Sequence, residues 1–414
     1  MAKKLVVCCD GTWNTPRTDT NIFRTYSFLR GRLGQPTEVS HKQGTRTCAG
    51  PAADGSDVVL FYDEGVGTQW FDRLIGGGAG IGLSENVREA YHFLGHNFEP
   101  GSEIYVFGFS RGAYTARSLC GFIKAAGLLV TPSVKDVWRA YMERYVTAHA
   151  PAIASRSAGL SLDGVRDWFV RKAGEAVGHL GGTEVAKLPT YGDVKIKFIG
   201  VYDTVGALGV PIPAVAKVNE PIVGFHDTTL GTTVESAVQA LAVDEKRGPY
   251  APTLWTRAAN AVAVAGQSVL QVWFPGVHSD IGGGYSDKGI GDITWDVMMR
   301  QAAGHGLVID PSQPTPRLTL NPLPAQHDSF DKTWQDLSTR LALIPENVRA
   351  IGPTTVGPNG EQLMVSPQVL LHSCLINRLG QRCTTIVDDK TNTRREGDYL
   401  PTNVTADSLP IWGA

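Results

Sequence analysis

Residues 103–117 read "EIYVFGFSRGAYTAR", an apolar run that ends in a Gly-x-Ser-x-Gly pentapeptide. The apolar run predicts a buried strand, and the residues after Ser110 predict a helix. Small residues at Gly108 and Gly112 permit a sharp turn between the two elements, on which a serine hydroxyl would be presented as a nucleophile. We therefore predict that Ser110 is a nucleophile. The alternative is an ordinary glycine-rich turn in which Ser110 caps the helix.

Three other apolar runs have the same form and also break at Gly or Asp. They are "KKLVVCCDGTWN" (3–14), "VKIKFIGVYDTVG" (194–206) and "QSVLQVWFPGVHSDIGGG" (267–284). Such runs are typical of buried parallel strands. A helix is expected over 84–98, with Ser84 as its N-cap. The alternation predicts an α/β-hydrolase-like, mostly parallel sheet covered by helices on both faces.

The chain divides into a predicted catalytic domain, 1–304, and a C-terminal extension packed on it, 305–414. Amphipathic patterns predict helical cap insertions at about 131–190 and 221–260. Aromatic residues of these insertions either line a substrate pocket or pack against their own helices. Those assigned to substrate binding are Trp138, Tyr141, Trp168 and Trp255.

Composition limits the partners and the compartment. With 38 Lys and Arg against 40 Asp and Glu, the net charge of -2 gives no reason to expect nucleic acid as a partner. Neither a signal-peptide core nor an apolar stretch of about 18 residues is present. We expect a soluble cytoplasmic protein without a transmembrane segment, with signal-less export and transient membrane contact left open. The cysteines form no CxxC pair and are expected to be reduced: Cys8, Cys9, Cys48, Cys120, Cys374 and Cys383.

A serine nucleophile needs a histidine base and an orienting carboxylate, which in this fold follow it in the order Ser, acid, His. Asp203 and His278 fit that order, and each comes directly after an apolar run. Asp280 is too close to His278 in sequence to orient it, and Asp244 is either a solvated or ion-paired charge or a pocket residue. Both are predicted to support the site.

The oxyanion of an acyl-transfer intermediate needs main-chain N–H donors. One is expected from Arg111, the residue after the nucleophile, and the other from Gly11 or Thr12 in "CCDGTWN". Asp10 would fix that loop. The alternative is a tight turn in which Asp10 is only a cap.

Two other interpretations compete with a cofactor-free serine enzyme. Five residues that follow strand-like runs would gather a metal in a metal-dependent phosphoesterase: Asp10, Asp203, His278, Asp280 and Asp287. A catalytically inactive hydrolase-fold binding protein is the other. The glycine-rich stretch 76–83 matches no nucleotide-binding pattern and is expected to be a flexible loop.

Six strings occur in order over roughly residues 5–300: "CDGTWN", "YDEGVGT", "GFSRGAYTAR", "GVYDTVGALG", "LAVDEKR" and "VWFPGVHSDIGGGY". In them the sequence resembles the α/β-hydrolase family numbered 2235 among domains of unknown function. That family includes the catalytic domain of family-one type VI secretion phospholipase effectors. The resemblance implies a triad of Ser110, Asp203 and His278. It also implies a carboxylic ester hydrolase that acts on a small ester or a lipid. Such an enzyme is an esterase or a lipase, and phospholipase A-type activity is included among the expectations.

Overall fold

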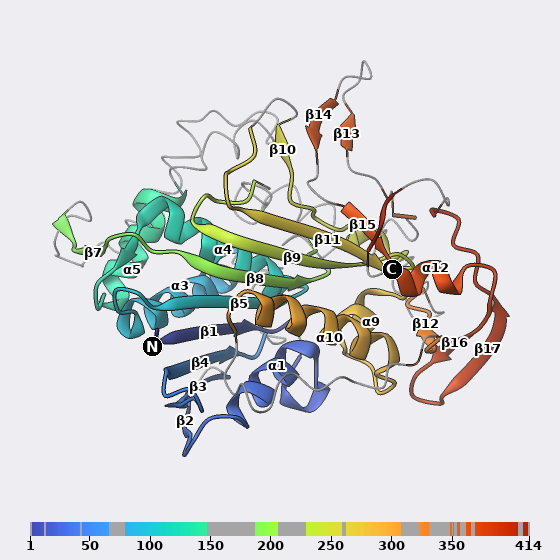
Figure 1. Ribbon diagram of the computed structural model, residues 1–414, viewed down its shortest axis with the longest axis horizontal. Helices are drawn as coiled ribbons and strands as arrows, with labels where there is room; N and C mark the ends of the chain where they lie inside the picture. The colour runs from blue at the N-terminus through green and yellow to red at the C-terminus, as the bar shows by residue number, and fades with distance from the viewer. Residues whose placement is uncertain are drawn as a thin grey trace.

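A ten-stranded sheet forms the centre of the computed structural model, in the order β18-β15-β11-β9-β8-β5-β1-β4-β3-β2 (Figure 1). The structure describes residues 2–11, 14–41, 44–65, 79–146, 187–205, 229–258, 262–307, 321, 323–330, 348, 349, 351, 354–356, 362–365, 369–404 and 409–412. The strands of this sheet are β1 (Lys4–Cys9), β2 (Thr37–Ser40), β3 (Thr45–Pro51), β4 (Asp57–Asp63), β5 (Glu103–Phe109), β8 (Ile196–Tyr202), β9 (Val234–Ala242), β11 (Ser268–Phe274), β15 (Val369–His372) and β18 (Ile411–Trp412).

The sheet is parallel from β4 through β1, β5, β8, β9, β11 and β15 to β18. At the other end of this sheet, β3 pairs antiparallel with β4 on one side and with β2 on the other. The four apolar runs predicted as strands are β1, β5, β8 and β11, so the prediction of a mostly parallel sheet is confirmed. Because the strands are parallel, the residues that follow them meet at one edge.

Helices cover both faces of the sheet (Figure 1). One face packs against α3 (Ala79–Asn97) and α4 (Arg111–Ala126), and the other packs against α1 (Asn21–Arg30) and α10 (Gly289–Gly304). Side chains alternate along β1, so Cys9 lies in the first core and Cys8 in the second. All six cysteines are free and buried, as expected. None of the helices in the described part of the chain has the length and apolar character of a bilayer-spanning segment.

The prediction of helical structure at about 221–260 is wrong. Within it, Val234–Ala242 forms β9, a central strand between β8 and β11 with both faces buried. The run "VESAVQALA" is rich in alanine and spaces its apolar residues as a helix would. Burial on both faces removes the alternation that would have marked a strand, so tertiary context overrides local preference.

The glycine-rich stretch also differs from its prediction. Residues 79–83, expected in a loop, are the first residues of α3, and Ser84 lies inside this helix and does not cap it. Serine is only mildly unfavourable within a helix, so it marks a helix start only where the preceding backbone is not helical. The first insertion, in turn, is described only in part. It contributes α5 (Val134–Ala140) and the π-helical turn η2 (Tyr141–Val146).

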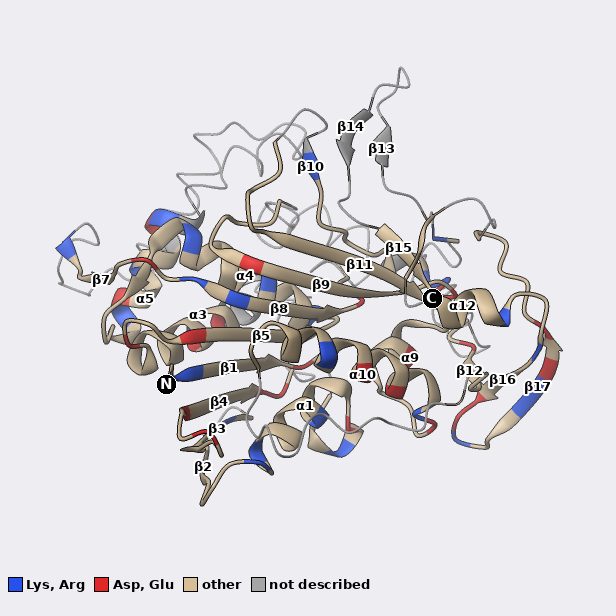
Figure 2. Ribbon diagram, viewed as in Figure 1, with Lys and Arg blue, Asp and Glu red and all other residues tan. Residues whose placement is uncertain are grey.

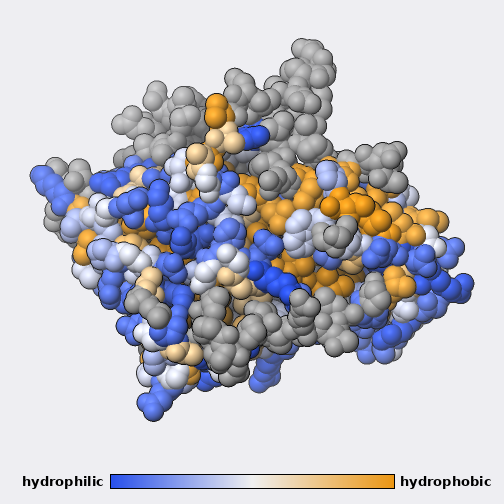
Figure 3. Space-filling model, in the orientation of Figure 1, coloured by the Kyte–Doolittle hydropathy of each residue, from blue (hydrophilic) through white to orange (hydrophobic). Residues whose placement is uncertain are grey.

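Residues beyond α10 contribute to the main sheet through β15 and β18. Their remaining strands include β12 (Gln326–His327), β16 (Arg382–Asp388) and β17 (Thr393–Asp398), which form a small separate sheet. Figure 2 shows β17 rich in both charges, whereas the central strands carry few. Figure 3 shows apolar residues gathered on the viewed face over β11, β15 and α12 (Ser373–Arg378). The C-terminal segment therefore extends the sheet and does more than lie on its surface.

Candidate active site

Ser110 stands at the turn between β5 and α4 with φ 58° and ψ −120°. This backbone conformation is rare for a residue with a side chain and costs on the order of 1–3 kcal/mol, which is typical of strained functional turns. The Ser110 side chain makes no capping hydrogen bond to α4. Its main-chain N–H donates to the Tyr202 carbonyl over 3.0 Å. That bond ties Ser110 to the end of β8, and the conformation is the strained elbow predicted from the sequence.

Two glycines make this turn sterically feasible. A Cβ on Gly108 would lie 2.4 Å from the Gly112 carbonyl oxygen, inside the turn itself. A Cβ on Gly112 would lie 2.1 Å from the Cys9 carbonyl oxygen, so α4 could not approach β1 as closely. Both positions therefore require glycine because neighbouring main chain occupies the space of a side chain.

Asp203 and His278 meet at the same edge of the sheet. Asp203 follows β8 with φ 40°, and His278 opens α9 (His278–Gly282) soon after β11. The imidazole Nδ1 of His278 lies 2.6 Å from Asp203 Oδ2. The ring centroid of His278 is also 4.7 Å from that of Phe109, the residue before Ser110. Asp203 and His278, which are far apart in sequence, are thus paired, and the imidazole lies against the residue that precedes Ser110.

Burial and charge define the ionisation of this pair. Burial alone would raise the pKa of Asp203, but the Arg349 guanidinium and the hydrogen bond from His278 hold it below its ordinary value. Burial lowers the pKa of His278, and the nearby Asp203 carboxylate only partly opposes this. The pair is therefore a charged carboxylate beside a neutral imidazole near pH 7, which is the state that a general base requires.

Two residues around the pair were missed by sequence analysis. Arg349 donates to both carboxylate oxygens of Asp203, over 2.6 and 2.9 Å. Glu245 accepts from the main-chain N–H of His278 over 3.2 Å and forms a salt bridge with Arg247. Glu245 lies in the "LAVDEKR" string, where only its neighbour Asp244 was considered. Nothing in sequence marks Arg349, which lies 146 positions from Asp203.

The loop after β1 lies against the elbow. A Cβ on Gly11 would be 3.3 Å from the Cβ of Ser110. The carboxylate of Asp10 accepts from the Thr20 and Tyr62 hydroxyls and from the Gly11 N–H of this loop. Burial raises the pKa of Asp10 to about 6, although these hydrogen bonds oppose the rise.

The structure does not support Gly11 as an oxyanion donor, because its N–H is committed to Asp10 Oδ1 over 2.8 Å. An N–H that already donates to a carboxylate is not available to an oxyanion unless that bond is broken. Thr12 lies outside the described residues. Arg111 is the first residue of α4 and directly follows Ser110.

The remaining carboxylates have structural partners. Asp244 accepts from the Gly276 N–H and the Tyr399 hydroxyl, so it is not a solvated charge. Asp280 accepts from the Val277 N–H and from the His327 imidazole at 2.6 Å, which secures the turn that precedes His278.

The five donors of the metal hypothesis do not converge. Asp203 is paired with Arg349 and Asp280 with His327, while Asp287 lies 3.8 Å from Arg394. Among the residues that the structure describes, no group of three or more His, Cys, Asp or Glu side chains is arranged to hold a metal ion.

Three of the predicted substrate-binding aromatics can be placed. Trp255 is buried in the core, with the Arg117 guanidinium 4.7 Å from its ring centroid. Trp138 lies under Arg88, and Tyr141 packs edge-on against Phe122, about three turns of α4 beyond Ser110. These contacts are with other side chains of the fold, in keeping with the alternative that the three aromatics pack within it. Trp168 lies outside the described residues.

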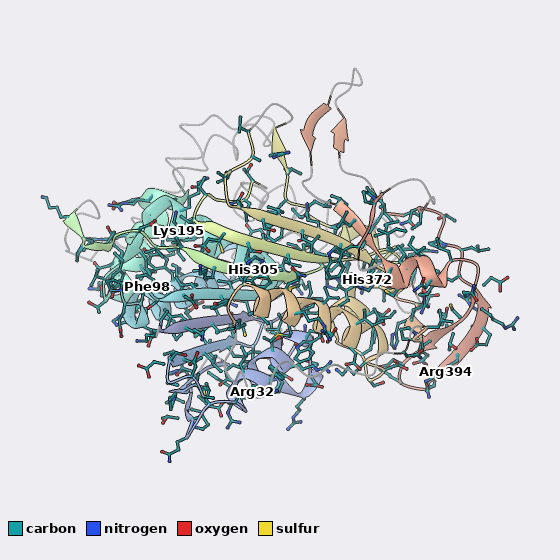
Figure 4. All side chains as sticks on the ribbon, viewed as in Figure 1. Arg32, Phe98, Lys195, His305, His372 and Arg394 are labelled. Carbon is teal, nitrogen blue, oxygen red and sulfur yellow. The ribbon has the colours of Figure 1, made fainter. Side chains whose placement is uncertain are left out.

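Two other histidines have clear structural roles, and Figure 4 labels both. His305 follows α10 and lies 3.0 Å from the Ser236 hydroxyl of β9. His372 is the last residue of β15 in the main sheet. It stacks on Phe274 and caps α12 by accepting the Cys374 N–H, and burial lowers its pKa to about 4. Neither contacts a carboxylate in the way that His278 does.

A mostly parallel sheet with helices on both faces and a strained serine after a central strand defines the α/β-hydrolase class. Within that class, the chain belongs to the family described as the catalytic domain of type VI secretion system phospholipase effectors that are Tle1-like. The family matches residues 3–301. The resemblance predicted from the six sequence strings is confirmed.

Individual relatives are distant. The uncharacterized protein YEL023C of Saccharomyces cerevisiae is 26% identical in an alignment 274 positions long, which covers 61% of this chain and 33% of the yeast protein. A crystal structure of an uncharacterized protein from Pseudomonas aeruginosa is 16% identical with a TM-score of 0.36, over 74% of this chain and 46% of that one. A structure of the Tle1 effector bound to the VgrG spike is 18% identical with a TM-score of 0.32, over 70% and 52%. The chain thus spans between a third and about half of each relative.

Proposed function

We propose that this chain is a serine hydrolase that cleaves carboxylic esters of lipids through an acyl-enzyme formed on Ser110. One observation carries the proposal. Ser110 has the strained elbow conformation beside the end of β8, and the next residue of that segment, Asp203, holds His278 at 2.6 Å. Membership in a family of phospholipase-type catalytic domains supports a lipid substrate.

In the proposed reaction, His278 Nε2 takes the proton of the Ser110 hydroxyl as its oxygen attacks the ester carbonyl carbon. Asp203 keeps the proton of the imidazole on Nδ1 and stabilises the imidazolium that forms. The intermediate collapses as the carbon–oxygen bond to the alcohol breaks, and His278 returns the proton to the leaving oxygen. Water then repeats the sequence and releases the fatty acid. The Arg111 N–H, at the start of α4, would donate to the oxyanion.

The first test is covalent labelling with a fluorophosphonate probe, read by mass spectrometry of the labelled peptide. We expect one adduct, on Ser110, which is lost in Ser110→Ala and retained in Ser118→Ala, a buried serine two turns further along α4. Labelling elsewhere, or none, would refute the nucleophile assignment. An absence of both labelling and turnover would instead favour a catalytically inactive binding protein.

The second test is turnover of p-nitrophenyl esters by histidine variants. His278→Gln should lower kcat/KM by on the order of 10⁴-fold, because the general base is removed. His305→Gln is the matched control, since it removes a partly buried imidazole that bonds the Ser236 hydroxyl of β9. Activity that survives Ser110→Ala but is abolished by a chelator would favour the metal-dependent phosphoesterase.

Substrate class is tested with phospholipid vesicles and triacylglycerol emulsions, with products separated by mass spectrometry. We expect a free fatty acid and a lysophospholipid from the vesicles. Hydrolysis of short-chain esters without release from either lipid would leave a general esterase. Ser110→Ala, assayed beside the wild type, removes contributions from contaminating lipases.

A further inference from the structure

The carboxylate of Asp203 is buried and accepts four hydrogen bonds. Oδ1 accepts from Arg349 and from the Ala242 N–H, and Oδ2 accepts from His278 and again from Arg349. Asp203 has no exposed surface. An ionised carboxylate in such a place is very unfavourable unless a paired charge compensates it. Arg349 supplies that charge in a two-pronged arrangement, which also restricts rotation of the carboxylate.

Arg349 is itself held rigidly. Only 4% of its surface is exposed, and its guanidinium also donates to the carbonyls of Ala242 and Tyr250. The amide of Asn403 donates to the Arg349 carbonyl over 3.0 Å and to the Val243 carbonyl over 3.1 Å. Arg349 is therefore fixed between the end of β9 and a residue much closer to the C-terminus.

Charged groups face His278 from several elements, and their signs differ. Asp203 and Glu245 favour the imidazolium, whereas the Arg247 guanidinium disfavours it. Arg349 contacts Asp203 directly and offsets its negative charge. Replacing Arg349 by a neutral side chain would leave the aspartate charge less compensated, so the imidazolium would become easier to form.

We infer that Arg349 is a positioning residue of the active site, which orients Asp203 toward His278 and sets the basicity of the imidazole. The inference rests on the proposed serine-hydrolase function. Arg349 lies beyond the residues 3–301 that match the family, so the C-terminal segment completes the catalytic site as well as the sheet.

The test compares Arg349→Gln and Arg349→Lys with Arg378→Gln. Arg378 is a matched control because it is a buried arginine of the same C-terminal segment whose guanidinium donates to Pro324 and Gln326 and not to Asp203. Each variant is assayed for kcat and KM on a p-nitrophenyl ester from pH 4 to pH 9. Thermal melting is measured in parallel.

For Arg349→Gln we expect kcat to fall on the order of 10²-fold with little change in KM, because the triad is misaligned while substrate contacts remain. The acid limb of the profile should move to higher pH. Arg378→Gln should keep the wild-type limb. A kcat within twofold of wild type, or an unmoved acid limb, would overturn the inference.

Arg349→Lys keeps the charge but not the two-pronged geometry. We expect its kcat to fall at least tenfold with the acid limb at the wild-type pH, and this variant carries the test if Arg349→Gln does not fold. Wild-type kcat in Arg349→Lys would overturn the positioning role. Ser110→Ala distinguishes a failure of the proposed function from a failure of the role assigned to Arg349. Undiminished activity in that variant would refute the proposed function itself, whereas its loss beside an unaffected Arg349→Gln would refute only the role of Arg349.

Discussion

Glu245 and His278 are joined by a hydrogen bond: the Glu245 Oε2 accepts the main-chain N–H of His278 over 3.2 Å. The imidazole of His278 bonds Asp203 at the same time. The other Glu245 oxygen accepts from the Arg247 guanidinium and the Ser329 hydroxyl. The Glu245 side chain has no exposed surface. One carboxylate therefore joins its own segment, which also carries Arg247, to the segments of His278 and Ser329.

Removing this carboxylate should destabilise the fold. In Glu245→Ala the buried salt bridge with Arg247 and the hydrogen bond from the His278 N–H are lost, and we expect the free energy of unfolding to fall by about 3 kcal/mol. Urea denaturation measures the loss. Glu235→Ala is the control, since its pair with Lys197 is partly exposed and worth at most about 1 kcal/mol. Equal losses in the two variants would contradict this role for Glu245.

The acid limb in the pH profile of kcat/KM should lie below the ordinary pKa of histidine. Burial lowers the pKa of His278, and only the neutral imidazole can accept the serine proton. Activity should therefore persist below pH 6.5, the ordinary pKa of histidine, and decline only as the imidazole becomes protonated at lower pH. Initial rates between pH 4 and pH 9 measure the limb. A midpoint at or above pH 6.5 is the contrary outcome.

Gly112→Ala should be much more damaging than an alanine elsewhere. The new Cβ would lie 2.1 Å from the Cys9 carbonyl oxygen and 2.4 Å from that of Asp10, so α4 must move away from β1. We expect the free energy of unfolding to fall by about 3 kcal/mol, measured by thermal and urea unfolding. Gly397→Ala is the control, because nothing lies within 4 Å of its Cβ position. A melting temperature for Gly112→Ala that matches the control would be inconsistent with the close approach.

Asp10 should make stability depend on pH. Burial raises its pKa in the folded state from 3.8 to about 6, so the folded protein binds this proton more tightly than the unfolded chain. The resulting contribution is fully present below about pH 3.8 and is lost as pH rises to about 6, with a total change of about 3 kcal/mol.

This dependence should disappear in Asp10→Asn. We expect the difference in the free energy of unfolding between wild type and Asp10→Asn to change between pH 4 and pH 7, in favour of the variant at pH 7. Asp57→Asn, at an exposed position on β4, is the control. A difference that is constant with pH would contradict the raised pKa of Asp10.

Local sequence predicted those parts of the fold in which pattern and environment agree. The runs before Ser110 and Asp203 are strongly apolar and end abruptly, and both are buried parallel strands with a polar residue at the shared edge. The prediction was wrong for β9, where alanine-rich spacing indicated a helix. It was also wrong for the start of α3, where Ser84 suggested a cap. At β9 the neighbouring strands β8 and β11, which no local window contains, determine the backbone.

The candidate site divides in the same way. The sequence alone indicated the elbow, because it has glycine at positions 108 and 112, where a side chain would meet neighbouring main chain. It also gave the chain order of Ser110, Asp203 and His278. Only the tertiary structure decided what surrounds them. Arg349 and Glu245 act by charge across distances of a few ångströms between segments that are far apart in the chain. Such contacts leave no periodicity or spacing in the sequence, because they exist only once the sheet has brought the strand ends together.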